Sequence, residues 1–298
     1  MGYDIVDLSK SIPNPFDDTE AFISAFLITY PIREVGVIAQ YVPSILREIA
    51  KDSKDWVTFN HNLEKRIDRT KNEIQRSSLL YIKQNVKSLF NIRTCEIPKE
   101  YFEKNIVFDF SSLNEASKTF YGEILLRKVW KEVKEKKGIL ICIDEAYRFS
   151  RYQENYNSVI SEISRQIRAF GKLFIITQNY SDIAKDVANQ FATQFIFNTT
   201  NEGDLKAFKE IDEKLSWSVA TLEKYNFTDA KYYYIHDVVP EIGLYYSPKE
   251  YKRNYVVTKE FRPTMAEIKE YILNFIEKNE CATTTQIAKN VSKNFRMG

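Results

Sequence analysis

Apolar runs and helical patterns alternate along the second half of the chain. Two runs, Asn105 to Leu113 (NIVFDFSSL) and Gly138 to Ile143 (GILICI), predict strands bounded by turn residues. Two more, Leu173 to Gln178 (LFIITQ) and Gln194 to Thr199 (QFIFNT), are apolar enough for buried strands. Helical patterns separate the four runs. Continuous apolar strands alternating with helices are typical of an α/β fold, in which a mostly parallel sheet has helices on both faces.

The predicted domain organisation follows from where this alternation begins and ends. Residues 1–18 predict a first strand followed by a proline-containing turn. Residues 19–104 have a helical pattern with few breaks, which predicts a helical insertion ahead of the α/β core at residues 105–247. Residues 248–263 predict a linker, and residues 264–298 predict a small helical segment.

Composition restricts the function classes without choosing one. The 298 residues are 44% hydrophobic and 28% charged, which is typical of a globular protein with a substantial core. The formal net charge is only +2, so any surface that attracts nucleic acid has to be local. The apolar stretches are too short to cross a bilayer, and the three cysteines lack metal-ligand spacing. We therefore expect a cytoplasmic protein with reduced thiols and no membrane segment.

Polar side chains lie at the ends of three predicted strands. They are Asp109, the adjacent pair Asp144 and Glu145, and Gln178. Because ligands bind beyond the carboxyl ends of parallel strands, these groups are expected to meet in one crevice. Transfer of a phosphoryl group to water needs a magnesium-holding carboxylate, a group that orients the water and an amide near the terminal phosphate. Asp144, Glu145 and Gln178 supply these three in that order.

Each of these residues also has a structural alternative. A strand that ends in two acids can simply enter solvent, and Gln178 can cap the turn that follows it. Asp109 fits a role in fixing its Ser-Ser-Leu turn better than a role in binding a ligand.

Several stretches taken together resemble the HerA/FtsK superfamily of ring-shaped, RecA-like DNA motors, and most nearly HerA and the conjugation-type secretion ATPases. The resemblance runs in order from Tyr3 to Tyr246. The matching stretches are NPFD at 14–17, VFDFSSL at 107–113, IDEAYRF at 143–149, SRQIRAFGKLFIITQ at 164–178 and NQFATQFIFNTTNEGD at 189–204.

The resemblance implies a role for each matching residue. Asp144 would be the Walker B acid that holds Mg²⁺ through water, Glu145 the catalytic base and Gln178 the sensor of the γ-phosphate. Arg168 matches an arginine that reaches the nucleotide from the neighbouring subunit, with Arg165 as the competing candidate and a helix-end cation as the structural alternative. The resemblance also implies a RecA-like fold, ATP and Mg²⁺ as cofactors, DNA as a partner and a ring that is hexameric in the full-length form.

The phosphate-binding loop of such ATPases, G-x-x-x-x-G-K-[ST], is absent from the 298 residues. In the family this loop precedes the Asn-Pro-Phe turn, so we expect it ahead of residue 1 or on another chain. Without it the chain lacks the backbone amides, lysine and hydroxyl that hold phosphate and magnesium, and should bind MgATP poorly by itself. The chain is then either the C-terminal part of an ATP-driven DNA translocase or a non-catalytic DNA- or partner-binding subunit. Unpaired sheet edges favour a homo-oligomer or pairing with a loop-supplying chain.

The tail predicts two capped helices. Thr264 with Glu267, and Thr283 with Gln286, fit the reciprocal capping box. The stretch TTTQIAKNVSKNF resembles the first two helices of a winged helix-turn-helix, and no acid follows Cys281. A helical hairpin packed on the core is the alternative, and a transcription regulator is a weaker third function. The candidate DNA-contacting residues of the tail are Lys289, Lys293 and Arg296.

Overall fold

The chain divides into two units, residues 1–256 and residues 257–298. The computed structural model describes residues 3–8, 12–32, 36–90, 94, 99–134, 136, 138–150, 158–197, 199–221, 230–236, 241–246 and 254–256. All of these belong to the first unit, so the predicted winged helix-turn-helix lies outside the described residues.

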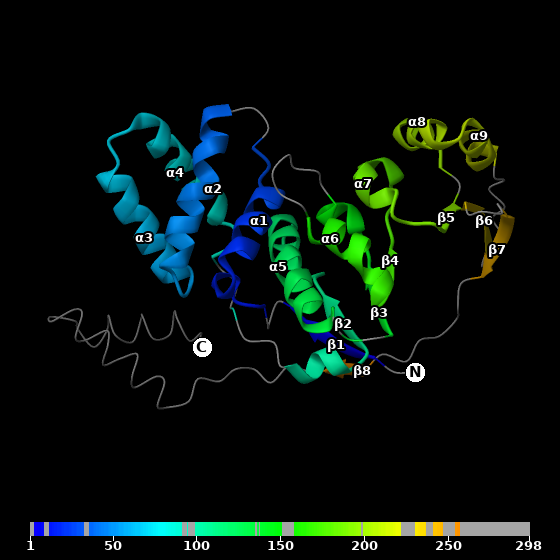
Figure 1. Cartoon of the computed structure of the whole chain (residues 1–298), viewed down its shortest axis with the longest axis horizontal. Coiled ribbons are helices and arrows are strands. Elements are labelled where there is room, and N and C mark those ends of the chain that lie inside the picture. Colours follow the sequence, from blue (N-terminus) through cyan, green and yellow to red (C-terminus); the bar gives the residue numbers. More distant parts are fainter. Residues whose placement is uncertain are drawn as a thin grey trace. The chain divides into compact units, whose positions relative to one another are not determined.

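Parallel strand pairing, predicted from the apolar runs, is confirmed in two sets of strands (Figure 1). Strand β3 pairs with β4, with Ile139 opposite Gly171 and Ile143 opposite Ile175. Strand β1 lies between β2 and β8 and is parallel to both. The bounds of these strands are Asp4–Asp7 (β1), Ile106–Asp109 (β2), Ile139–Ile143 (β3), Gly171–Ile175 (β4) and Asn254–Val256 (β8). Strand β8 falls within the stretch that was predicted as a linker.

The fourth predicted strand is β5, and it does not join β4. It pairs antiparallel with β6, which in turn pairs antiparallel with β7. Two helices, α8 and α9, lie between β5 and β6 in the chain. The bounds are Gln194–Phe197 (β5), Glu202–Ile211 (α8), Glu213–Thr221 (α9), Ala230–His236 (β6) and Glu241–Tyr246 (β7).

Helices cover one face of the β3–β4 pair. Ile141 and Ile143 on β3 are buried in a cluster with the buried residues of α6, including Ile160 and Ile163. Helix α5 precedes β3 and adds Trp130 to this cluster. The helices and helical turns of this part are α5 (Glu115–Val133), η3 (Ala146–Phe149), α6 (Val159–Gln166), η4 (Ile167–Ala169), η5 (Tyr180–Asp182) and α7 (Lys185–Ala188).

The opposite face of the same strands is open and mostly apolar, with the exposed Lys172 opposite Leu140. Leu140 on β3 is 66% exposed, Phe174 on β4 is 51% exposed and Phe195 on β5 is 49% exposed. The rings of Phe174 and Phe195 are stacked with centroids 6.4 Å apart, although β4 and β5 are not hydrogen-bonded to each other. Among the described residues the expected second layer of helices is therefore not seen over this face.

The predicted helical insertion, residues 19–104, begins with α1. Three amphipathic helices, α2 to α4, follow it in the part that the structure describes. Helix α1 packs against α5, and its Phe22 contacts Phe120 at 5.6 Å between ring centroids. The Asn-Pro-Phe turn joins this core because Phe16 stacks on Phe22 at 5.1 Å, while the Asn14 side chain donates to the Lys54 carbonyl at 3.0 Å. The bounds are Pro15–Asp17 (η1), Thr19–Thr29 (α1), Gly36–Lys51 (α2), Trp56–Arg69 (α3), Glu73–Val86 (α4) and Lys99–Glu103 (η2). Of the helices described, none has the length and apolarity of a bilayer span.

Candidate functional site

The carboxyl ends of β3 and β4 are joined beyond the strands themselves. The Ile176 amide donates to the Ile143 carbonyl at 2.9 Å, and the Ala146 amide donates to the Ile176 carbonyl at 3.0 Å. Asp144 directly follows β3, and Gln178 lies three residues beyond the end of β4. Because the strands are parallel, the structure brings these two exposed residues to the same edge of the sheet.

Glu145 has an unusual backbone conformation next to Asp144. Its φ of 51° and ψ of 42° are left-handed, and no other non-glycine residue described has a positive φ. Such a conformation costs an L-residue about 1–2 kcal/mol, so neighbouring contacts have to hold it. One is local, since the Glu145 amide donates to Oδ1 of Asp144 at 2.9 Å.

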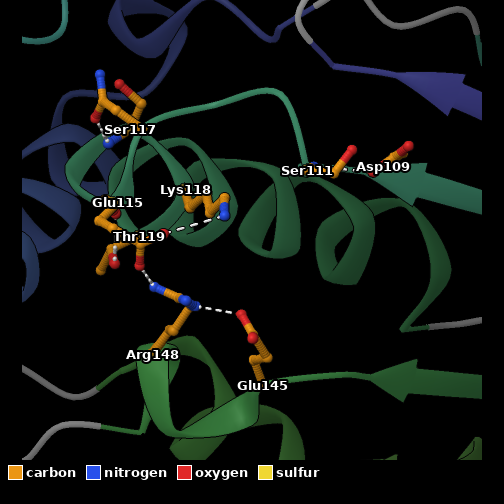
Figure 2. A network of polar contacts seen from close by, with 9 residues as sticks. Asp109, Ser111, Glu115, Ser117, Lys118, Thr119, Glu145 and Arg148 are labelled. Carbon is orange, nitrogen blue, oxygen red and sulfur yellow. Dashed lines mark hydrogen bonds and ion pairs between the residues drawn. The ribbon is translucent and has the colours of Figure 1, made fainter.

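Arg148 provides the second contact (Figure 2). Its Nε donates to Oε2 of Glu145 at 2.7 Å, and its Nη1 forms an ion pair with Oε2 of Glu115 in the first turn of α5. The guanidinium also lies 5.1 Å from the centroid of the Tyr147 ring, and only 12% of the Arg148 side chain is exposed. One cation thus holds two carboxylates from separate elements.

The contacts of Arg148 with Glu145 and Glu115 favour the charged forms of Arg148 and Glu115. Burial by itself would lower the pKa of Arg148, but its hydrogen bonds with Glu145 and Glu115 outweigh burial and raise the pKa. The hydrogen bond from Arg148 in turn lowers the pKa of Glu115. In this arrangement the positive charge of Arg148 offsets the negative charge of the Glu145 carboxylate.

Gln178 does not fix the turn in which it lies. The Thr177 hydroxyl donates to the Asn179 carbonyl at 2.9 Å, and the Asn179 side chain donates to Asp182 at 2.9 Å. Gln178 is exposed and has no hydrogen-bond partner among the residues described. Its amide is therefore available to a ligand at this edge.

Asp109 has the structural role expected from the sequence. Its Oδ1 accepts a hydrogen bond from the Ser111 amide at 2.9 Å, which closes the turn after β2 (Figure 2). The partner strand ends in Asp7, which lies opposite Asp109 and accepts from the Ser112 hydroxyl at 3.3 Å. Both carboxylates thus accept hydrogen bonds from the serines of this turn.

The two candidate arginines lie at the other end of β4. Arg168 is in η4, which precedes the strand, and its Nη2 donates to the Gln190 carbonyl at 3.0 Å. Arg165 pairs with Asp186 of α7 at 3.1 Å. The five residues of β4 span about 13 Å at about 3.3 Å per residue, so neither arginine reaches the Asp144 edge of its own chain. The candidate DNA contacts Lys289, Lys293 and Arg296 lie outside the described residues.

The donor set at the edge fits a hydrated magnesium ion. Within the described residues, no three His, Cys, Asp or Glu side chains come together as a metal cage. A single exposed carboxylate such as Asp144 is nevertheless what Mg²⁺ uses when water and phosphate supply most of its ligands.

Arg148 and Glu115 are the members of this site that the sequence did not identify. Arg148 stands three residues after Glu145, a spacing at which side chains in one helical turn are neighbours. Glu115 is 30 residues before Glu145, and no periodicity connects the two.

Comparison with known proteins identifies the fold. No family model and no curated protein sequence matches the chain. Among solved structures, VirB4 of Thermoanaerobacter pseudethanolicus is similar with a TM-score of 0.55 and 14% identity, over 81% of this chain and 75% of that one. The genome packaging NTPase B204 of Sulfolobus turreted icosahedral virus 2, in complex with AMPPCP, gives a TM-score of 0.40 and 21% identity over 52% of this chain and 73% of that one. At this identity the likeness to VirB4 is one of fold, and it agrees with the α/β fold class predicted from the sequence.

Proposed function

We propose that the carboxyl edge of β3 and β4 is the hydrolytic half of the nucleotide site of an ATP-driven DNA translocase. The observation that carries this proposal is the position of Asp144, Glu145 and Gln178 at one edge of a parallel strand pair. These are the residue types that phosphoryl transfer to water requires.

Each of the three has a separate task. Asp144 binds magnesium-bound water, and the ion itself offsets negative charge on the phosphate oxygens. Glu145 accepts the proton of the attacking water. The amide of Gln178 donates to an oxygen of the terminal phosphate and so distinguishes ATP from ADP.

Glu145 has to leave Arg148 before it can accept a proton. Its Oε2 is the atom that Arg148 Nε binds at 2.7 Å, so this oxygen cannot take up the proton of a water while the hydrogen bond is in place. The ion pair with Glu115 keeps Arg148 in place after the release of Glu145. Nucleotide binding at the edge is the event that releases Glu145 from Arg148.

The phosphate-binding loop comes from outside these 298 residues, either from a preceding segment or from another chain. Support comes from the open apolar face that includes Leu140, Phe174 and Phe195, because apolar strands of this kind are normally covered on both faces. A strand and helix carrying the loop would cover it. Arg168 completes the site from a neighbouring subunit, and the basic tail contacts DNA.

A second function, that of a non-catalytic subunit, is favoured by two observations. The sequence has no G-x-x-x-x-G-K-[ST], and the Glu145 carboxylate is occupied by Arg148. In that case the fold serves to bind DNA or a partner, and the acids of the edge stabilise the turn.

Nucleotide titration separates the two functions. The chain alone should bind a fluorescent MgATP analogue more weakly than the micromolar range, and the chain joined to or mixed with the loop-bearing segment should bind it in that range. Asp144→Asn should weaken the second binding, while Asp68→Asn, the same change at an exposed position of α3, serves as the control. Micromolar binding by the chain alone contradicts the need for the loop, and no binding in either form favours the non-catalytic subunit.

A further inference from the structure

A cleft in the helical insertion has a charge pattern that the nucleotide site does not explain. It measures about 760 Å³ and is formed by the end of α2, the outward face of α3 and the start of α4. Five cations and two carboxylates line it, which gives a net charge of +3. One of the carboxylates, Glu48, is paired with Arg66 at 2.6 Å.

The remaining four cations form no ion pair with a described residue, although a second acid, Asp52, also lines the cleft. Lys51, Lys65, Arg69 and Lys71 are exposed, and none lies within 4.0 Å of a carboxylate in the part of the chain that the structure describes. Other cations of these helices do form ion pairs: Arg47 with Glu20, Arg66 with Glu48 and Lys83 with Glu64. Among the described residues, the cleft thus gathers four cations without an ion pair in one place, although other exposed cations without an ion pair, such as Lys54 and Arg76, lie outside it.

Folding alone explains only part of this pattern. Lys51 and Arg69 lie in the last turns of α2 and α3, where a cation complements the helix dipole. Lys65 lies one turn before Arg69 on the same face, and like charges at this spacing repel. Lys71 lies beyond the end of α3, in the connection to α4, where no dipole argument applies. Neither an ion pair nor the helix dipole therefore accounts for Lys65 and Lys71 in this cleft.

We propose that this cleft binds the sugar–phosphate backbone of DNA as a second contact, separate from the tail. Four unpaired cations along one open cleft match a row of phosphates rather than a single anion. The Gln75 side chain in the wall adds a neutral donor. Only the choice of DNA rests on the proposed function, because the unpaired charge is there whether or not the chain takes part in ATP hydrolysis.

The test measures DNA binding by the full chain without nucleotide, using fluorescence anisotropy of a labelled duplex and of a single strand. Salt is varied from about 50 to about 200 mM, the range over which phosphate contacts lose most of their strength. The double variant Lys65→Gln with Arg69→Gln removes two cleft cations. The control Lys131→Gln with Lys134→Gln removes the same charge from exposed positions at the end of α5.

The cleft variant should lower the affinity about tenfold at the lowest salt and make the slope of log K against log salt shallower by about 1.8, or about 0.9 for each lost phosphate contact. The control should change neither quantity. A third variant, Lys289→Gln with Lys293→Gln, tests the tail. Unchanged affinity and slope in the cleft variant overturn the proposal, whichever result the tail variant gives. Equal losses in the cleft variant and the control also overturn it, because they show a dependence on total charge only.

DNA binding that is lost in the cleft variant supports the proposal even if the chain never takes part in ATP hydrolysis. A wild-type chain that binds neither duplex nor single strand at about 50 mM salt overturns the cleft proposal directly. Thermal melts of all variants check that the exposed substitutions leave the fold intact.

Discussion

Glu123 on α5 is an acid with no exposed surface. Its Oε1 accepts from Arg127 at 2.8 Å and from the Val159 amide at 2.9 Å, at the start of α6. Its Oε2 is buried without a hydrogen-bond partner in the structure described. Burial raises the pKa of Glu123 to about 7, although the charge of Arg127 and the Val159 amide act in the opposite direction.

This pKa predicts a loss of stability as the pH rises. The folded state holds the proton up to about pH 7, whereas the unfolded state releases it near pH 4.5. The contribution of Glu123 is therefore complete below pH 4.5 and is lost as the pH rises through 7. Glu123→Gln removes this dependence. In urea denaturation, the difference in free energy of unfolding between Glu123→Gln and wild type should shift by about 2–3 kcal/mol in favour of the variant from pH 5 to pH 8.

Glu73→Gln is the control for this pH effect, because Glu73 is an exposed acid on another helix, α4. It should change little between the two pH values. A difference between Glu123→Gln and wild type that is the same at pH 5 and pH 8 contradicts the assignment.

Arg148 is predicted to stabilise the fold as well as to restrain Glu145. Arg148→Ala removes a nearly buried cation and leaves the left-handed Glu145 without its side-chain partner. We expect a loss of about 2 kcal/mol in the free energy of unfolding. Arg66→Ala, which breaks an exposed ion pair with Glu48, should cost less than about 1 kcal/mol. Equal losses in urea denaturation contradict a special role for Arg148.

At the scale of elements, β3 and β4 approach each other closely at one glycine. A Cβ atom on Gly171 would lie 2.0 Å from the Ile139 carbonyl oxygen, and this oxygen belongs to backbone that cannot turn aside. Gly171→Ala should therefore cost about 2 kcal/mol or more of stability. The same substitution at Gly203 meets only side-chain atoms of Asn201 and Ser181 at 3.1 Å, and should cost less than about 1 kcal/mol. Similar melting temperatures for the two variants contradict the close approach.

Some elements could be predicted from the sequence and others could not. The runs that became β3 and β4 were predictable because both are continuous and apolar, and parallel pairing placed Asp144 and Gln178 at one edge. Strand β8 has only three residues and no apolar run, so its pairing with β1 depends on tertiary contacts. The contact of Arg148 with Glu115 was equally hidden, because it depends on how η3 packs against α5.

At the scale of the molecule, substitutions on the open sheet face should affect the binding of another segment more than the stability of the chain. Leu140→Lys should change the free energy of unfolding by less than about 0.5 kcal/mol, because Leu140 is 66% exposed. Its neighbour Ile141 is buried, and Ile141→Ala should cost about 2–4 kcal/mol. If the loop-bearing segment covers this face, Leu140→Lys should also abolish its binding in a pull-down. Strong destabilisation by Leu140→Lys contradicts the exposure of this face.

The role of Glu145 as a base is tested most directly by the rate of ATP hydrolysis in the assembly that includes the phosphate-binding loop. Glu145→Gln should lower kcat at least about 100-fold and leave KM for MgATP within about threefold, because a general base acts in the chemical step and contributes about 10²–10⁴. Hydrolysis by Glu145→Gln at the wild-type rate contradicts the account.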